Sequence, residues 1–272
     1  MERVYKMKQV LTIAGSDSGA GAGIQADLKT FAANGVYGLS TIVAITAQNT
    51  KRVKSIFSLP ENIVEDQLDV LFEDFDISAV KTGMLFSSNI IEIVSNIIKK
   101  YKVEKVVLDP VMISKSGNKL LEDSAIDTLV DKFIPLAYII TPNINEAERL
   151  LNIKISNLDD MYKAAEKLCS FGCKNVLVKG GHLNFSKAVD ILFDGHNHYE
   201  FSSEMINSKN THGTGCTYAS AIAANLAKGY NTNLAIEYAK KYLTEAIVWA
   251  QSNKIGHGYG PLNHFYMLTN IK

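Results

Sequence analysis

The sequence predicts a three-layer α/β/α fold, in which a mostly parallel central sheet is covered by helices on both faces. Short, continuously apolar runs alternate along the 272 residues with longer amphipathic stretches. Continuous apolar runs are typical of strands buried on both faces, as in a parallel sheet. The segment 188–201 differs, because an Asp-Gly pair separates two extended runs and predicts an antiparallel edge hairpin. No linker rich in Pro, Ser or Gly divides the chain, so we expect a single domain spanning residues 1–272.

The first half of the chain alternates strands and helices. Strands are expected at the apolar runs 10–14, 39–47 and 77–80. A helix is expected from about Ile24, because Ile24, Leu28 and Phe31 fall on one face. Asn34-Gly35 can end that helix in a left-handed cap. A second helix precedes residue 77, and Pro60 can begin it because a first helical turn leaves its amides unpaired in any case.

The second half repeats the alternation and then becomes helical. Apolar residues at helical spacing predict a helix over 90–100. Strands are expected at 106–108, 138–140 and 176–178, and each of them is flanked by a helical stretch. After the hairpin, helices are expected at about 215–228 and 234–251.

The charge balance excludes some function classes. The 28 Lys and Arg residues equal the 28 Asp and Glu residues, which argues against a nucleic-acid partner, because such binders usually carry a basic excess. No apolar stretch approaches the roughly 20 residues of a membrane span, and the three cysteines do not suggest a disulfide framework. We therefore expect a cytoplasmic protein without a membrane or nucleic-acid partner. A local anion site stays compatible with zero net charge.

Polar or glycine-rich residues follow six predicted strands. Ligand crevices of open α/β sheets lie beyond the carboxyl ends of the strands, so these residues are candidates for one site assembled from many loops. The segments are Gly15 to Gly23, Gln48-Asn49, Gly83-Met84, Asp109 to Val111, Thr141 to Asn143 and Lys179 to His182.

The first glycine loop does not match a dinucleotide fingerprint. Its glycines are spaced G-x-G-x-G, and no acidic residue occurs between Asp27 and Glu61, where a ribose-binding acid would be expected. Two interpretations remain: a backbone that a ligand can approach closely, or a tight strand-to-helix turn.

The second glycine segment, Asn210 to Thr217, opens a predicted helix. Unpaired amides and the helix dipole make such a start favourable for anions, and Gly213 and Gly215 remove side-chain bulk. We favour a phosphate cradle over an ordinary helix start. Cys216 would lie in the first turn, where thiol pKa values tend to fall, so it is a candidate base or nucleophile.

Asn143 and Glu146 lie three residues apart at another predicted helix start. Their oxygens could reach one hydrated Mg²⁺. The alternative is an ordinary capping box, in which the two residues cap the helix reciprocally. The residues themselves favour the cap.

Together these segments resemble the ribokinase-like small-molecule kinases, and more specifically the hydroxymethylpyrimidine/phosphomethylpyrimidine kinases of thiamine biosynthesis. The resemblance extends over nearly the whole chain. It is carried by 12–17, 21–31, 47–50, 81–85, 108–112, 115–117, 141–146, 179–182, 210–217 and 256–261. Many motifs in the same order make the resemblance specific, whereas one glycine loop would not.

The resemblance implies roles for the matching positions. Cys216 would be the catalytic residue, with Gly213, Thr214 and Gly215 in the anion hole. Cys216 stands where many members of the wider superfamily have Asp. The pyrimidine pocket would be formed by Ala22, Gly23, Asp27, Gln48, Met84 and Val111. The nucleotide would be bound by Asn143, Lys179, Thr211, Gly213 and Gly215. Asp109 and Glu146 would face Mg²⁺, and Lys115, Ser116 and Gly117 would form a mobile flap.

The implied reaction is phosphoryl transfer from ATP, with Mg²⁺, to the hydroxymethyl group of an aminopyrimidine and then to its monophosphate. Gln48 suits this ring, because one amide can donate to a ring nitrogen and accept from the exocyclic amine. The alternatives are a pyridoxal or pyridoxine kinase on the same scaffold and, in another class, a metabolite-binding protein without turnover. A homodimer is also expected from the family.

Overall fold

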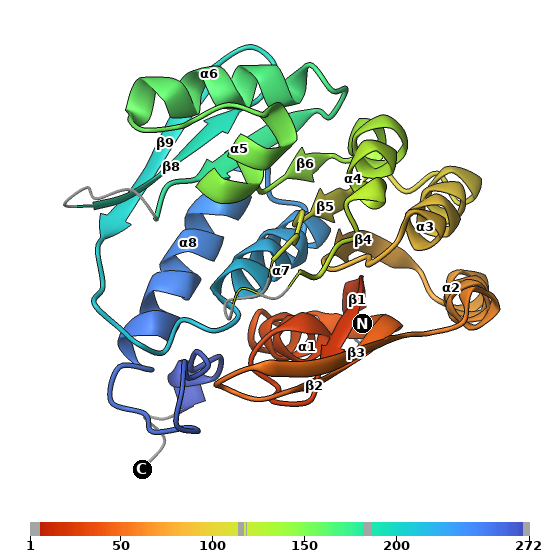
Figure 1. Ribbon diagram of the computed structural model, residues 1–272, viewed down its shortest axis with the longest axis horizontal. Coiled ribbons are helices and arrows are strands. Elements are labelled where there is room, and N and C mark those ends of the chain that lie inside the picture. Colours follow the sequence, from red (N-terminus) through yellow and green to blue (C-terminus); the bar gives the residue numbers. More distant parts are fainter. Residues whose placement is uncertain (1–5, 114–116, 118, 182–186, 269–272) are drawn as a thin grey trace, which may run out of the picture.

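The strands form one twisted sheet at the centre of the molecule (Figure 1). The computed structural model describes residues 6–113, 117, 119–181 and 187–268. The strands are β1 (Gln9–Asp17), β2 (Tyr37–Gln48), β3 (Val53–Ser58), β4 (Ile77–Thr82), β5 (Val106–Leu108), β6 (Ile139–Ile140), β7 (Asn175–Lys179), β8 (Lys187–Phe193) and β9 (His198–Glu204). Their order across the sheet is β3-β2-β1-β4-β5-β6-β7-β8-β9.

The predicted mostly parallel sheet is confirmed, with antiparallel strands at both edges. The six strands from β2 to β7 in this order pair in parallel. The predicted hairpin is confirmed as β8 and β9, although four residues, 194–197, connect them rather than a two-residue Asp-Gly turn. The Asp194 carboxylate accepts hydrogen bonds from the His196 and Asn197 amides and closes this longer loop. β3, which pairs antiparallel with β2, was not expected from the sequence.

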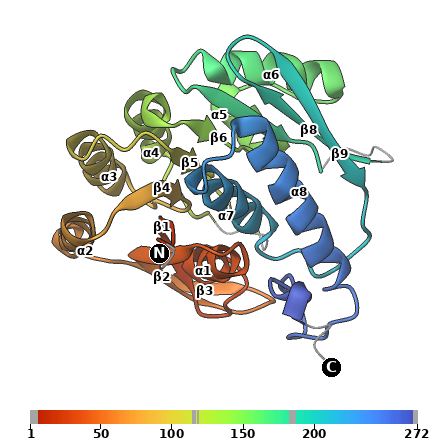
Figure 2. The same ribbon diagram turned by 180° about the vertical axis from the view of Figure 1, so that it is seen from behind.

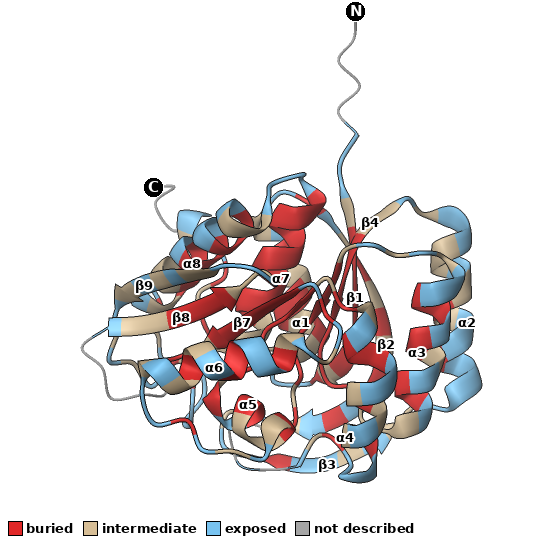
Figure 3. Cartoon of the chain, turned by 90° about the horizontal axis from the view of Figure 1, so that it is seen from above, coloured by how far each residue is buried: buried red, intermediate tan, exposed pale blue. Residues whose placement is uncertain are grey.

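Helices cover both faces of the sheet, as expected for three layers (Figures 2 and 3). One layer contains α1 (Gly23–Ala33), α7 (Thr214–Ala227) and α8 (Thr232–Val248). The other contains α2 (Glu61–Asp74), α3 (Ser88–Lys100), α4 (Ser124–Thr128), a π-helical turn (Leu129–Phe133), a 3-10 turn (Ile134–Leu136), α5 (Ile144–Leu151) and α6 (Leu158–Cys169). A last 3-10 turn covers Tyr266–Leu268. No helix in these ranges is long and apolar enough to cross a membrane.

The apolar runs of the sequence are explained by these two layers. Val106 and Leu108 of β5 belong to the hydrophobic core under α2–α6, whereas Val107 between them belongs to the core under α1, α7 and α8. Successive side chains of a strand point to opposite faces, so a strand between two cores has no polar positions. Figure 3 shows these strands as buried between the helical layers.

The helix boundaries follow local chemistry at several of the predicted positions. Pro60 is the N-cap of α2, as expected. Asn34 is the C-cap of α1, and Gly35 beyond it has a φ of +73°, which glycine adopts without strain. Because the six parallel strands point the same way, the loops after their carboxyl ends all meet at one edge of the sheet.

Candidate active site

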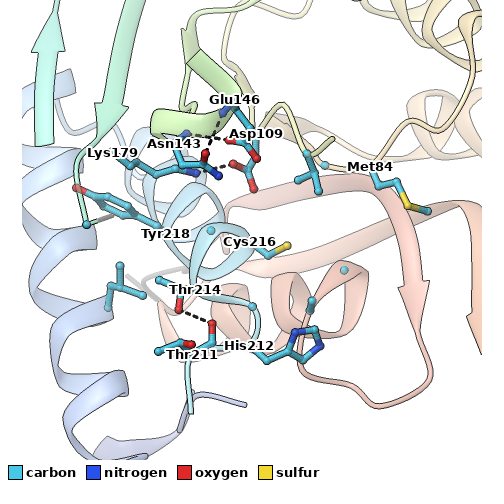
Figure 4. Close-up of a pocket in the computed structure, with 18 of the residues that line it drawn as sticks. Met84, Asp109, Asn143, Glu146, Lys179, Thr211, His212, Thr214, Cys216 and Tyr218 are labelled. Atoms are coloured by element: carbon cyan, nitrogen blue, oxygen red, sulfur yellow. Dashed lines mark hydrogen bonds and ion pairs between the residues drawn. The ribbon is translucent and has the colours of Figure 1, made fainter. Parts of the chain in front are cut away.

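A cavity of about 630 Å³ lies at the carboxyl edge of the parallel strands. Residues from the ends of β1, β2, β4, β5, β6 and β7 line it together with the start of α7. Of the residues assigned to a site from the sequence, the structure brings these to the cavity wall: Ala22, Gly23, Gln48, Met84, Asp109, Val111, Asn143, Glu146, Lys179, Thr211, Gly213, Thr214, Gly215 and Cys216. Figure 4 shows several of them facing the same space.

Asp27 is the exception among the described pocket residues, because it does not line the cavity. Its side chain is fully buried below the wall, where its carboxylate accepts from Thr12 Oγ1 at 2.6 Å and Ser220 Oγ at 2.7 Å. Lys81 Nζ completes its environment at 2.8 and 3.0 Å. Contrary to the expectation that it lines the pyrimidine pocket, Asp27 is not part of the cavity wall. Asp27 instead joins β1, α1, β4 and α7, since its partners come from those elements.

The flap lies largely outside the described residues. Lys115 and Ser116 are not among them, and neither is His182. Gly117 is described and has a φ of +85°, with open space where a side chain would project.

The first glycine loop is a tight strand-to-helix turn, as one of its two interpretations predicts, and it also borders the cavity. Asp17 organises the loop, because its carboxylate accepts from the amides of Gly19, Gly21 and Ala22 at 2.8 to 3.1 Å. Gly23 has a φ of +58°, and a Cβ there would lie 2.3 Å from the Gly15 carbonyl oxygen. Close packing of backbone on backbone therefore requires this glycine.

The second glycine segment forms the start of α7, as predicted. Gly213 is its N-cap in a left-handed conformation with φ +85°. A Cβ on Gly213 would lie 1.8 Å from the Gly21 carbonyl oxygen, so this glycine is required by contact between the two loops. Gly215 differs, since a Cβ there would approach only Asp109 Oδ2 at 3.4 Å and Lys179 Nζ at 3.5 Å. The absent side chain of Gly215 thus leaves space beside charged groups, as a phosphate cradle requires.

The pKa of Cys216 is raised, contrary to the expectation from its place in a first helical turn. Burial raises the pKa of this thiol to about 11, Lys81 opposes the rise, and the charges of Asp27 and Asp109 add to it. The carboxylates and the loss of water outweigh the helix start. Cys216 is therefore a neutral thiol at neutral pH.

A polar cluster lies opposite Cys216 at the ends of β5, β6 and β7 (Figure 4). Lys179 Nζ is 2.8 Å from Asp109 Oδ1. Asn143 and Glu146 form a complete capping box on α5: the Glu146 amide donates to Asn143 Oδ1 at 3.0 Å, and the Asn143 amide donates to Glu146 Oε2 at 2.8 Å. The capping interpretation is confirmed, and the same two residues also face the cavity.

The charges of this cluster fit a bound cation. Burial raises the pKa of Glu146 to about 7, Lys179 opposes the rise and Asp109 adds to it. In the described ranges, no group of three His, Cys, Asp or Glu side chains could hold a metal ion by itself. Mg²⁺ commonly uses only one or two carboxylates and takes its other ligands from phosphates and water. Asp109 and Glu146, which line the cavity together with the glycine-rich start of α7, meet that requirement.

A more apolar part of the cavity extends between the hairpin and α8. Ala188, Met205, Ile206, Leu243 and Ile247 line it. Two of its polar members, Asp190 and Lys240, pair at 2.6 Å, and the Asp190 carboxylate also accepts from the Gly180 amide at 3.1 Å. This compartment has space and apolar walls for a flat ring next to the cradle.

Sequence reasoning assigned no role to two cavity residues, Asp17 and His212. His212 Nε2 lies 2.7 Å from Asp17 Oδ2 and joins the two glycine loops across 195 positions of the chain. Both residues are inside motifs that carry the family resemblance. The sequence did contain a signal for Asp17. An acidic residue at the start of a glycine-rich loop can accept hydrogen bonds from the loop amides, which need an acceptor.

Six converging strand ends, an anion cradle at a helix start and a carboxylate pair define a ribokinase-like kinase of small molecules. The family model described as phosphomethylpyrimidine kinase matches residues 17–263. The chain therefore belongs to the phosphomethylpyrimidine kinase family.

Two curated relatives agree with this membership. The chain is 46% identical over 268 residues to the hydroxymethylpyrimidine/phosphomethylpyrimidine kinase of Bacillus subtilis, covering 98% of the chain and 97% of the relative. It is 50% identical over 263 residues to the thiamine biosynthesis bifunctional protein of Geobacter sulfurreducens, covering 97% of the chain. The chain spans only 53% of that bifunctional protein.

Solved structures include both ring specificities that the sequence left open. An ADP complex of Bacillus subtilis pyridoxal kinase superposes with a TM-score of 0.90 at 39% identity, covering 97% of the chain and 100% of that structure. The phosphomethylpyrimidine kinase of Clostridium difficile superposes with a TM-score of 0.79 at 49% identity, covering 88% of the chain and 99% of that structure. The fold is common to both specificities.

Proposed function

We propose that this protein transfers the γ-phosphoryl group of ATP to the hydroxymethyl group of 4-amino-5-hydroxymethyl-2-methylpyrimidine and then to the resulting monophosphate. The observation that carries the proposal is that Cys216 and the start of α7 line one cavity together with Gln48, Met84 and Val111 and with the polar cluster of Asp109, Asn143, Glu146 and Lys179. The residues at these places match the family motifs.

The two substrates occupy opposite sides of the cradle in this proposal. The pyrimidine lies against Ala22, Gly23, Gln48, Met84 and Val111. The phosphates of ATP lie over Gly213 to Gly215, with Lys179 and Asn143 beside them, and the nucleoside occupies the compartment between the hairpin and α8. The hydroxyl is then held in line with the γ-phosphate, and positioning of this kind is the main source of catalysis in phosphoryl transfer.

The polar cluster supplies the charges for this transfer. Asp109 and Glu146 would hold Mg²⁺, which neutralises phosphate charge when it is bound. Glu146→Gln is expected to raise the Mg²⁺ concentration that gives half-maximal turnover. An unchanged Mg²⁺ dependence would remove Glu146 from this role.

Cys216 is the proposed catalytic residue. With a pKa of about 11, the thiol is suited to orient the substrate hydroxyl by hydrogen bonding rather than to act as a preformed thiolate. Cys216→Ala is expected to lower kcat strongly, and wild-type turnover in this variant would make the assignment wrong.

ATP consumption with three substrates tests the proposal as a whole. Turnover is measured with the hydroxymethylpyrimidine, with its monophosphate and with pyridoxal. We expect the highest kcat/KM with the two pyrimidines. The high TM-score to a pyridoxal kinase keeps a pyridoxal activity as the second candidate, and a preference for pyridoxal would support it. Absence of turnover with all three would favour a binding protein.

Assembly and location are proposed from the family alone. We propose a homodimer that acts in the cytoplasm. Size-exclusion chromatography with light scattering measures the first property, and a monomer at working concentration would contradict it.

A further inference from the structure

The two glycine loops are interlocked at Gly21, His212 and Gly213. A Cβ on Gly21 would lie 2.3 Å from His212 Cδ2, and a Cβ on Gly213 would lie 1.8 Å from the Gly21 carbonyl oxygen. A side chain at Gly213 would therefore collide with backbone, whereas one at Gly21 would have to displace the His212 ring. His212 is the side chain that lies between them, and it borders the cavity.

Asp17 fixes the His212 ring. The Asp17 carboxylate is almost fully buried, and it already accepts from three amides of its own loop. Burial disfavours its charge, but the His212 ring and the amides outweigh burial and hold the pKa of Asp17 below its usual value. Asp17 is thus a carboxylate at neutral pH and can only accept. His212 Nε2, at 2.7 Å, must carry the hydrogen and donate it.

The donor on His212 Nε2 determines how the Gln48 side chain is turned. Gln48 Nε2 lies 3.2 Å from His212 Nε2, so two donors face each other in this orientation of the amide. At the other end, Gln48 Oε1 lies 3.2 Å from Thr46 Oγ1. The Thr46 hydroxyl has one hydrogen, which it can donate to this oxygen or to the Ser16 carbonyl at 2.9 Å, so one of these two acceptors does not receive it.

A half-turn of the Gln48 amide removes the conflict at His212 and frees the Thr46 hydrogen for the Ser16 carbonyl. Amide oxygen and nitrogen are distinguished by their hydrogen-bond network, because the two atoms are nearly equal in size. After the half-turn, Gln48 Oε1 lies 3.2 Å from His212 Nε2 and shares with Asp17 the single hydrogen of that nitrogen, and Gln48 Nε2 donates to Thr46. The result is a continuous chain of donors and acceptors from Asp17 through His212, Gln48 and Thr46 to Ser16. All five residues line the cavity.

This orientation leaves Gln48 with one N–H hydrogen and one oxygen lone pair unused in the chain. Side by side, they form a donor and an acceptor. An aminopyrimidine edge offers the complement, namely a ring nitrogen that accepts and a neighbouring amine that donates. A pyridoxal ring has no such amine.

We propose that His212 is a positioning residue that sets the orientation of the Gln48 amide and thereby selects an aminopyrimidine edge. The proposal rests on the proposed function, since it concerns the pyrimidine that the kinase phosphorylates. His212 acts through Gln48 and needs no contact with the reacting atoms.

A double-mutant cycle between the two residues tests the proposal. In wild-type protein, His212→Ala is expected to raise KM for the hydroxymethylpyrimidine about tenfold, because one oriented hydrogen bond is lost. The KM for ATP should change less than about twofold, as the cradle amides are retained. In a Gln48→Ala background, adding His212→Ala should have almost no further effect on the pyrimidine KM. Equal effects in both backgrounds would overturn the proposal.

Two further variants separate positioning from structural damage. His212→Gln is expected to restore most of the affinity, because its amide has two hydrogens for Asp17 and Gln48. His196→Ala, in the exposed hairpin loop, is the matched control and should leave all constants unchanged. If His212→Ala does not fold, Gly21→Ala tests the same point by displacing the ring, and an unchanged pyrimidine KM in that variant would refute the role.

A substrate analogue without the exocyclic amine supplies the specificity readout. Wild-type protein should prefer the amine-bearing ring, and His212→Ala should lose most of that preference. A preference retained in full would contradict the proposal. Failure of the wild-type protein to phosphorylate any pyrimidine would instead contradict the proposed function.

Discussion

Lys81 Nζ lies 2.8 and 3.0 Å from the two carboxylate oxygens of Asp27, and neither side chain has any exposed surface. Burial would lower the pKa of Lys81, but the Asp27 charge outweighs burial and raises it well above its usual value. The ammonium is therefore permanently charged below the cavity, where its charge also reaches Cys216. Such a pair stabilises one arrangement of the four elements that it joins.

Breaking this pair on one side is expected to destabilise the protein strongly. Lys81→Met leaves the Asp27 charge buried without its cation, at a cost of about 3–5 kcal/mol in the free energy of unfolding. Asp27→Asn combined with Lys81→Met removes both charges and should restore at least half of the loss. Urea unfolding of the wild type, both single variants and the double variant measures this. Additive losses would show that the two charges do not compensate each other.

The Cys216 thiol is expected to react slowly with iodoacetamide. A pKa of about 11 leaves a thiolate fraction at neutral pH about a hundredfold below that of an ordinary cysteine. The alkylation rate should therefore rise about tenfold for each pH unit up to pH 10. Cys216→Ser corrects for labelling of Cys169 and Cys173. A plateau in the rate below pH 8 would show a thiolate already formed.

We expect the protein to lose stability in acid because the His264 side chain is buried. Its buried ring lies 3.0 Å from Thr217 Oγ1 in the first turn of α7, and burial lowers the pKa of His264 from 6.5 to about 4. Between these values the unfolded chain binds more protons, so stability is fully present above pH 6.5 and falls as the pH drops through 4. The expected loss is about 3 kcal/mol. His264→Gln retains the hydrogen bond but cannot titrate, so urea unfolding at pH 5 and 7 should show a smaller decline. An equal decline would assign the acid sensitivity to other groups.

Alanine substitutions at Gly213 and Gly229 distinguish the effect of backbone strain from the effect of contact between the two glycine loops. Both have left-handed φ values, +85° and +95°, but only Gly213 has a neighbour where a Cβ would project. Gly229→Ala is expected to cost about 1–2 kcal/mol of stability and leave turnover intact. Gly213→Ala adds a collision with the Gly21 carbonyl and should lower kcat about a hundredfold by displacing the cradle. Similar effects of both substitutions on thermal unfolding and turnover would mean that the loops are not interlocked.

Local patterns in the sequence were sufficient for most of the fold. The continuous run 106–108 predicts a strand because both faces of that strand are buried, and the structure places Val107 and its neighbours in opposite cores. The edge strand β3 was missed, since a half-exposed strand has a weaker apolar pattern. The hairpin turn was also mispredicted, because the Asp194 side chain caps a longer loop.

The sequence by itself determined which residues gather at the candidate site, because parallel strands bring their carboxyl ends to one edge and the motifs follow those ends. Tertiary structure alone decided what each of them contacts. Asp27 belongs to a motif that was assigned to the pocket, but its carboxylate forms a buried ion pair with Lys81. Burial and neighbouring carboxylates raise the pKa of Cys216, although its place at a helix start would lower it. Asp17 and His212 meet only after folding, and a hydrogen bond between residues 195 positions apart leaves no periodic pattern along the chain.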